Sequence, residues 1–278
     1  MDRPLRVVSV LPSATEMLCF IGGGHLLVGR SHEDNYPESI THLPIVTGQL
    51  TEFTTAVDVD RQVSSALSTG QSLYTIDEQL LTSLQPDVIL TQDICAVCAI
   101  DLQTVQRLAA RMSPQPRVVS LNPLGLDDVL DNLLQVGEAV GMEREAQAAR
   151  EGLEARLRRA DELVAASQAA AAATAVAKPT EEARPCVAFI EWPEPLYVGG
   201  HWTPQLIERA GGTHPLNPAR PEGAAKSFAV TAEAMIATVP RLAILAPCGL
   251  NLQQTRRGRE PGLGSEPGPV LGSAIDLQ

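Results

Sequence analysis

The segment DEQLLTSLQPDVILTQD, residues 77–93, joins an amphipathic stretch to the continuous apolar run PDVIL and then turns polar. An apolar run that does not alternate is typical of a strand buried on both faces of a sheet. Similar pieces lie on either side of it: RVVSVLP, LLVGRS, DLQTVQRLAARM, PRVVSLNP and DDVLDNLLQVGEAVG. Strands that alternate with helices predict a parallel sheet covered on both faces. We therefore predict an α/β lobe over residues 1–142.

A second, shorter α/β lobe is predicted over residues 185–252. Its strands are CVAFIEW and RLAILAP, and its helices are TPQLIERAGG and VTAEAMIAT. Between the lobes, residues 143–175 carry one long helical pattern that would extend about 45 Å, which predicts a connecting helix. Residues 176–184, rich in Ala, Pro and charge, predict a flexible loop. The Gly- and Pro-rich residues 253–278 predict a disordered tail.

The composition excludes several classes of partner. The chain has 278 residues with 33 Asp and Glu against 21 Lys and Arg, a formal net charge of -12. Such a surface repels a phosphate backbone, so we expect no nucleic-acid partner. No apolar run approaches the roughly 18 to 20 residues that span a bilayer, and the first residues lack the pattern of a secretory signal. Five cysteines, an odd number spread along the chain, do not indicate a disulfide scaffold, and we expect a cytoplasmic protein.

Polar residues follow the predicted strand PDVIL in the loop that carries Asp93, Cys95 and Cys98. Ligands of open α/β sheets bind beyond the carboxyl ends of the strands. A Cys-x-x-Cys pair supplies half of a tetrahedral metal site, and no second pair is present in the sequence. Three interpretations stay open: thiols that line a ligand site or hold a soft metal, a redox pair at a helix start, and small buried residues.

The loop HEDNYP, residues 32–37, follows the predicted strand LLVG and holds His32, Glu33 and Tyr36. Imidazole and carboxylate are ordinary ligands of a divalent metal. Adjacent residues of an extended segment point in opposite directions, so His32 and Glu33 reach one ion only where the loop turns. Tyr36 offers a flat apolar face with a hydroxyl group. The alternative is a turn whose Asp, Asn and Pro only shape the backbone.

Both tryptophans of the chain lie in EWPEPLYVGGHW, residues 191–202, which we interpret as a connection after a strand. Glu191 is next to Trp192, and His201 is next to Trp202. Aromatic rings with polar neighbours on a loop indicate a stacking wall for a flat ligand, and two glycines before His201 would let the backbone approach it. The alternative is a hydrophobic plug between a strand and the following helix.

The order of SVLPSATE, VGRSHEDNYP, SLYTIDEQLLTSLQPDVILTQD, CAVCAI, VVSLNP, EWPEPLYVGGHW and ERAGG resembles that of the class III periplasmic binding proteins. Within them the chain is most similar to the cobalamin and iron-siderophore type of ABC transporter substrate-binding subunits. The resemblance implies two Rossmann-like α/β lobes joined by one backbone helix, with a ligand in the cleft between them. It also places Tyr36 where relatives contact the corrin. In the family the second lobe continues beyond PCGL, so we expect an incomplete second lobe here.

The resemblance implies a non-catalytic protein that binds cobalamin, an iron chelate or a metal ion. An ABC permease is a doubtful partner, because the sequence has no evident export signal. The alternatives are a thiol- or metal-dependent enzyme and a scaffold that has lost ligand binding. The predicted ligand contacts are Glu33, Tyr36, Asp93, Glu191, Trp192 and Trp202, and the predicted metal ligands are His32, Cys95, Cys98 and His201.

Overall fold

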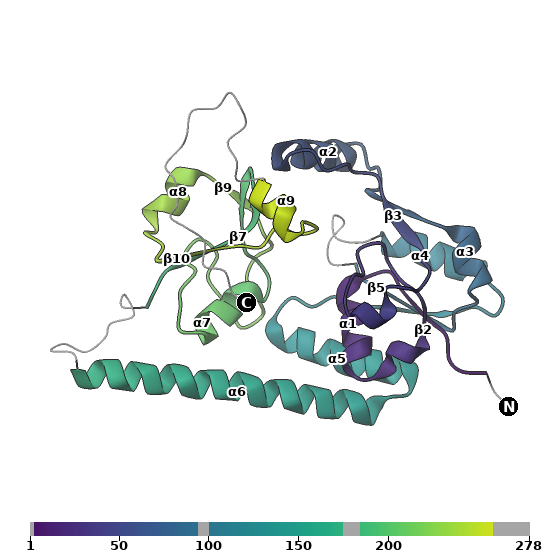
Figure 1. The fold of residues 1–278 in the computed structure, drawn as a ribbon, viewed down its shortest axis with the longest axis horizontal. Helices are drawn as coiled ribbons and strands as arrows, with labels where there is room; N and C mark the ends of the chain where they lie inside the picture. Colours follow the sequence, from purple (N-terminus) through teal and green to yellow (C-terminus); the bar gives the residue numbers. More distant parts are fainter. Residues whose placement is uncertain (1–2, 94–99, 175–183, 258–278) are drawn as a thin grey trace. The chain divides into compact units, whose positions relative to one another are not determined.

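The computed structural model describes residues 3–93, 100–174 and 184–257. The chain divides into two compact units (Figure 1). The first unit comprises Met1–Glu52, Arg61–Pro123 and Asp127–Ala155, and the second comprises Phe53–Asp60, Leu124–Leu126 and Arg156–Gln278. Within the described ranges, no helix has both the length and the hydropathy that crossing a bilayer requires.

The first unit is built on a four-stranded parallel sheet in the order β2-β1-β5-β6. The strands are β1 (Val7–Ser9), β2 (Leu27–Gly29), β5 (Val88–Thr91) and β6 (Arg117–Ser120). β5 begins in the apolar run PDVIL and ends one residue beyond it, at Thr91, and all four of its residues are buried. The predicted α/β class is therefore confirmed, and the carboxyl ends of these strands share one edge of the sheet.

Helices cover both faces of this sheet. They are α1 (Pro12–Phe20), α3 (Glu78–Ser83), α4 (Leu102–Ala109) and α5 (Leu126–Val140). Successive strand residues point to opposite faces, so Val7 and Leu90 join the core that includes α1 and α5. Val8 and Ile89 join the other core, which includes α3 and α4. This arrangement explains why the strands are apolar without alternation.

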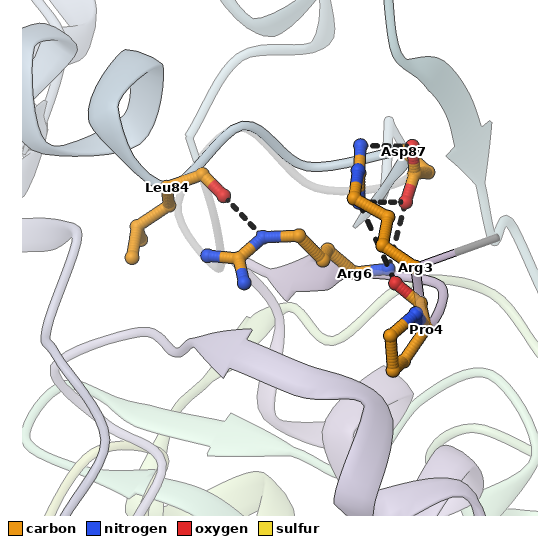
Figure 2. Close-up of polar contacts among 5 residues, drawn as sticks. All are labelled: Arg3, Pro4, Arg6, Leu84 and Asp87. Carbon is orange, nitrogen blue, oxygen red and sulfur yellow. Dashed lines mark hydrogen bonds and ion pairs between the residues drawn. The ribbon is translucent and has the colours of Figure 1, made fainter. Parts of the chain in front are cut away.

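The amino-terminal edge of the sheet is fixed by the carboxylate of Asp87, which immediately precedes β5 (Figure 2). Its Oδ1 and Oδ2 accept hydrogen bonds from the two terminal guanidinium nitrogens of Arg3, at 2.7 and 2.8 Å. Oδ2 also accepts from the backbone N–H of Arg6 at 2.8 Å, and the Arg6 side chain donates to the carbonyl oxygen of Leu84 at 2.7 Å. These contacts align the segment before β1 with the segment before β5.

Several elements of the first unit are not predicted from the sequence. β3 (Thr47–Gln49) and β4 (Tyr74–Ile76) form a separate antiparallel pair. The short 3-10 helices η1 (Gly23–Leu26) and η2 (Glu38–Ile40) also lie outside the predicted elements. The helix α2 (Ala56–Ser68), which contributes residues to both units, was not predicted either. β3 and β4 are far apart in the sequence and only three residues long, so neither gives a strong local pattern.

The second unit contains a mixed sheet in the order β10-β7-β8-β9. Its strands are β7 (Val187–Pro193), β8 (Leu196–Val198), β9 (Ala229–Val230) and β10 (Leu242–Leu245). β10 is parallel to β7, whereas β8 is antiparallel to both of its neighbours. The interpretation of residues 191–202 as one connection is wrong, because β7 continues through Trp192 and returns as β8 after two residues. A connection of two residues joins only antiparallel strands.

The longest helix is α6 (Glu143–Thr174), and it contributes to both units. The second unit also has α7 (Thr203–Arg209), α8 (Ala232–Ala237) and α9 (Leu252–Arg257). The Nε of Arg209 donates to Asp161 at 3.1 Å and so ties α7 to α6. α9 occupies the start of the segment predicted to be disordered, and residues 258–278 lie outside the described residues. The predicted flexible loop lies outside them as well, except for its last residue, Arg184.

Candidate functional site

In the first unit, the loop after β2 is built around the buried side chain of Asp34. Its Oδ2 accepts hydrogen bonds from the backbone N–H of Ser31 at 2.8 Å and from the Thr15 hydroxyl at 2.9 Å. The guanidinium of Arg30 donates to the carbonyl oxygen of Asp34 at 2.8 Å and to that of Thr41 at 2.7 Å. These bonds join the loop to helix α1 and fix its path at the carboxyl edge of the sheet.

Burial raises the pKa of the Asp34 carboxyl group. The hydrogen bonds from Ser31 and Thr15 and the charge of Arg30 oppose this shift, and the nearby Glu16 adds to it. Asp34 is 1% exposed, and within the described residues its Oδ1 is buried without a hydrogen-bond partner. The loop is therefore held by a carboxylate whose charged form is only partly compensated.

His32 and Glu33 are the central residues of a turn, which the Asp34 N–H closes onto the Ser31 carbonyl at 3.3 Å. Because the chain turns here, the side chains of His32 and Glu33 can point to the same side of the loop. They line one small cavity of about 10 Å³ together with Thr47 and residues after β1. That volume is about what a single water molecule occupies.

The His32 ring is held by residues from the antiparallel pair β3–β4. Its Nδ1 lies 2.8 Å from the Thr47 hydroxyl, and its ring centroid lies 5.7 Å from that of Tyr74. Its Nε2 is buried and has no hydrogen-bond partner within the described residues. Burial lowers the pKa of His32, the Gln49 side chain partly opposes this shift, and burial raises the pKa of Glu33. Both shifts favour the neutral forms.

Tyr36 lies on a different surface from His32 and Glu33. It is 65% exposed and lines a pocket of about 620 Å³ whose other walls come from α1, Pro37, α5 and α6. All of the residues that line this pocket belong to the first unit. Asp93 lines neither cavity, and its backbone N–H donates to the Asn122 side chain at 2.6 Å. The predicted contacts of the first unit thus occupy three separate places.

In the second unit, the turn between β8 and α7 holds Glu191, Gly200 and His201 together. The backbone N–H of Gly200 donates to Oε1 of Glu191 at 3.0 Å. The N–H of His201 donates to the carbonyl of Ala225 at 3.1 Å, and the His201 carbonyl accepts from the N–H of Ala224 at 2.8 Å. His201 has a φ of 52°, in the left-handed region that few side-chain-bearing residues adopt. Three hydrogen bonds hold this backbone in place.

The His201 imidazole is partly buried beside Trp202, with ring centroids 5.8 Å apart and an interplanar angle of 36°. Its Nε2 is buried and has no hydrogen-bond partner in the described part of the chain. Burial lowers the pKa of His201, the Glu191 carboxylate opposes this, and Lys226 adds to the lowering. The ring is therefore favoured in its neutral form, which has a lone pair available.

The two tryptophans have different surroundings. The indole N–H of Trp192 donates to the carbonyl oxygens of Ala56 and Glu194, at 3.2 and 3.1 Å. Trp202 lies at the start of α7, and its ring packs near His201. Trp192 thus ties the β7–β8 hairpin to the short segment Phe53–Asp60 of the same unit.

Within the described ranges, no group of three or more His, Cys, Asp or Glu side chains is placed to hold a metal ion. Cys95 and Cys98 lie outside the described residues, so the metal set that includes them stays a prediction. Sequence reasoning missed Asp34 and Thr47 as the residues that position the loop after β2. Asp34 is part of the quoted motif, but the contact between His32 and Thr47 spans 15 residues and has no local signal.

Comparison with known proteins identifies the fold. The sequence matches no protein-family model and no curated protein. A periplasmic heme-binding protein from Pseudomonas aeruginosa is 22% identical, with a TM-score of 0.63 over 92% of this chain and 76% of that one. The periplasmic vitamin B12-binding protein BtuF of Vibrio cholerae is 16% identical, with a TM-score of 0.58 over 87% and 76%. The periplasmic heme-binding protein HutB of Vibrio cholerae is 18% identical, with a TM-score of 0.58 over 87% and 76%. The chain therefore has the fold of these periplasmic binding proteins.

Proposed function

We propose that this chain is a non-catalytic binding protein for a flat metal complex of the heme or cobalamin kind. The observation that carries the proposal is the geometry of His201. Its neutral imidazole has a buried nitrogen without a partner in the described residues, next to an aromatic ring, on a backbone held in an unusual conformation. The fold supports the proposal, because solved proteins that share it are named as heme- or vitamin B12-binding proteins.

The backbone at His201 is suited to present a ligand to a metal. A left-handed φ on a residue other than Gly costs roughly 1 kcal/mol or more and persists where the surroundings enforce it. Here the carboxylate of Glu191 holds Gly200, and Ala224 and Ala225 hold His201. A side chain that is positioned before binding loses less entropy when the ligand arrives. Imidazole is an ordinary ligand of iron and of other transition metals, and the Trp202 ring offers a face for a flat macrocycle.

We propose three candidate ligands. Cobalamin and heme each combine a flat macrocycle with a metal that can take an axial imidazole, so both are candidates. An iron chelate is the third candidate ligand. We also propose that the protein acts in the cytoplasm, which the five dispersed cysteines support. Cell fractionation with an antibody against the chain tests the location.

The proposal is tested by titrating the purified protein with hemin and with aquocobalamin, following the visible absorption spectrum. Axial ligation by imidazole shifts the spectrum, whereas adsorption elsewhere on the surface does not give the same shift. His201→Asn is the informative variant, because Asn tolerates the left-handed conformation better than Ala does. We expect this variant to bind at least about tenfold more weakly.

His25→Asn serves as the matched control, since His25 is exposed in the first unit and its ring contacts only the carbonyl of Gly22 among the bonds described. It should bind as the unsubstituted protein does. The proposal fails if neither compound binds at micromolar concentration, or if His201→Asn retains both the affinity and the spectral shift.

A further inference from the structure

The pocket of about 620 Å³ in the first unit has no role in the function proposed above. One wall is the face of α1 that carries Ser13, Glu16, Met17 and Phe20. These positions are spaced three, one and three residues apart and so share one side of a helix. The opposite side of α1 buries Ala14, Thr15 and Leu18 in the core of the unit. On the pocket side, Met17 also packs against this core, whereas Ser13, Glu16 and Phe20 are exposed.

The size and the surface of this pocket fit a small organic molecule. Small-molecule sites are commonly about 300 to 1,000 Å³, mostly apolar, with a few polar groups. Leu133 and Leu153, from α5 and α6, form part of an apolar wall. Phe20 is 55% exposed and Tyr36 is 65% exposed, and both line the pocket. Aromatics are only 3% of the chain, so two exposed rings on one pocket are a distinctive feature.

The charges around the pocket favour a cation. Glu16 is the one carboxylate among the described residues that line it, and no Lys, Arg or His lines it there. The thiol of Cys19, also in the lining, has its pKa raised by burial and then by the negative charges of Asp34 and Glu16. Among the residues that line the pocket, Glu16 therefore supplies the negative charge. Arg150, near Leu153 along α6, is engaged by the carboxylates of Asp131 and Glu154.

We propose that this pocket is a binding site for an apolar organic cation, which contacts the rings of Phe20 and Tyr36 and is attracted by Glu16. Aromatic faces attract cations through their quadrupoles, and an apolar body fills the space between the helices. The inference uses residues of the first unit alone and does not depend on His201 or on the metal complex proposed above.

The experiment uses two probes of the same size and shape and of opposite charge, tetraphenylphosphonium and tetraphenylborate. Isothermal titration of the full chain measures the affinity of each. We expect one phosphonium ion per chain, bound at least about fivefold more tightly than the borate. Phe20→Ala should weaken binding of both ions, because it removes an apolar wall. Glu16→Gln should reduce the preference for the cation by about two- to fivefold and leave the borate nearly unchanged.

Glu138→Gln is the matched control, because Glu138 is exposed on α5 and pairs with Arg117 away from the pocket lining. It should leave both affinities unchanged. Glu16 and Phe20 are exposed, so their variants should fold, and circular dichroism checks this. The inference is overturned if the borate binds as tightly as the phosphonium, or if Phe20→Ala leaves phosphonium binding unchanged. It is also overturned if Glu16→Gln and Glu138→Gln have the same effect.

Discussion

At the scale of single residues, Asp34 is a carboxylate in an unusual, buried environment. It is almost fully buried, it accepts hydrogen bonds through one oxygen, and burial raises the pKa of its carboxyl group. A raised pKa means that the folded protein binds the proton more tightly than the unfolded chain does. The contribution of Asp34 to the free energy of unfolding is therefore largest in acid and is lost as the pH rises through the folded-state pKa.

This sign leads to a test with Asp34→Asn, which keeps the shape and one acceptor oxygen but removes the ionisable group. As the pH is lowered from 7 towards about 4, the ordinary range of a carboxyl pKa, the unsubstituted protein should gain stability relative to this variant. Urea unfolding at several pH values measures the difference. Asp127→Asn, on the exposed first turn of α5, controls for the loss of one surface carboxylate. A gap that stays constant with pH would contradict the expectation.

At the scale of elements, the sequence predicted the helices and strands that are determined by interactions between residues close together in the chain. The helix α3 begins after Asp77, whose side chain accepts from the Leu80 N–H, as the segment DEQLLTSL indicates. The apolar run PDVIL became the central strand β5 for the same reason. The β7–β8 hairpin and the β3–β4 pair were missed, because their partners are specified by turn geometry and distant pairing. The same holds for the candidate site. A turn at His32 and Glu33 could be considered from the sequence, whereas the contact of His32 with Thr47 could not be predicted.

Alanine substitutions at two glycines should have opposite effects on the free energy of unfolding, because the space around the two positions differs. A Cβ at Gly200 would lie 2.4 Å from the backbone nitrogen of Ser227 and 2.8 Å from the carbonyl of Ala225. Gly200→Ala should therefore destabilise the protein by about 1–3 kcal/mol. A Cβ at Gly152, inside α6, would meet nothing within 4 Å. Gly152→Ala should stabilise by about 0.5–1 kcal/mol through its better helix propensity. Urea unfolding followed by circular dichroism compares the two, and shifts of the same sign would be inconsistent with this packing.

At the scale of the whole molecule, the net charge opposes self-association, whereas an exposed apolar edge strand favours it. Within the described residues no strand pairs with the outer edge of β10, where Leu242 is 41% exposed and Ile244 is 36% exposed. An exposed apolar edge strand is a template for pairing with another chain. The formal net charge of -12 keeps copies of the chain apart at neutral pH.

Self-association should therefore increase in mildly acidic solution, where carboxylates lose their charge. Sedimentation velocity at pH 7 and near pH 5 measures it. Ile244→Lys places a charge on the edge strand and should reduce the associated fraction severalfold. Arg256→Lys, which preserves charge at another exposed position of the second unit, is a control that should leave association unchanged. Equal association of the unsubstituted protein and Ile244→Lys would show that β10 is not the contact.

The ion pair between Arg3 and Asp87 has a practical consequence for binding assays. It ties the start of the described chain to the amino-terminal edge of the first sheet, away from the edge that carries the loops after β2 and β5. A biotin or affinity tag added before Arg3 would consequently emerge on the side opposite those loops. A sensor chip loaded through such a tag would leave the His32 turn facing the flowing analyte.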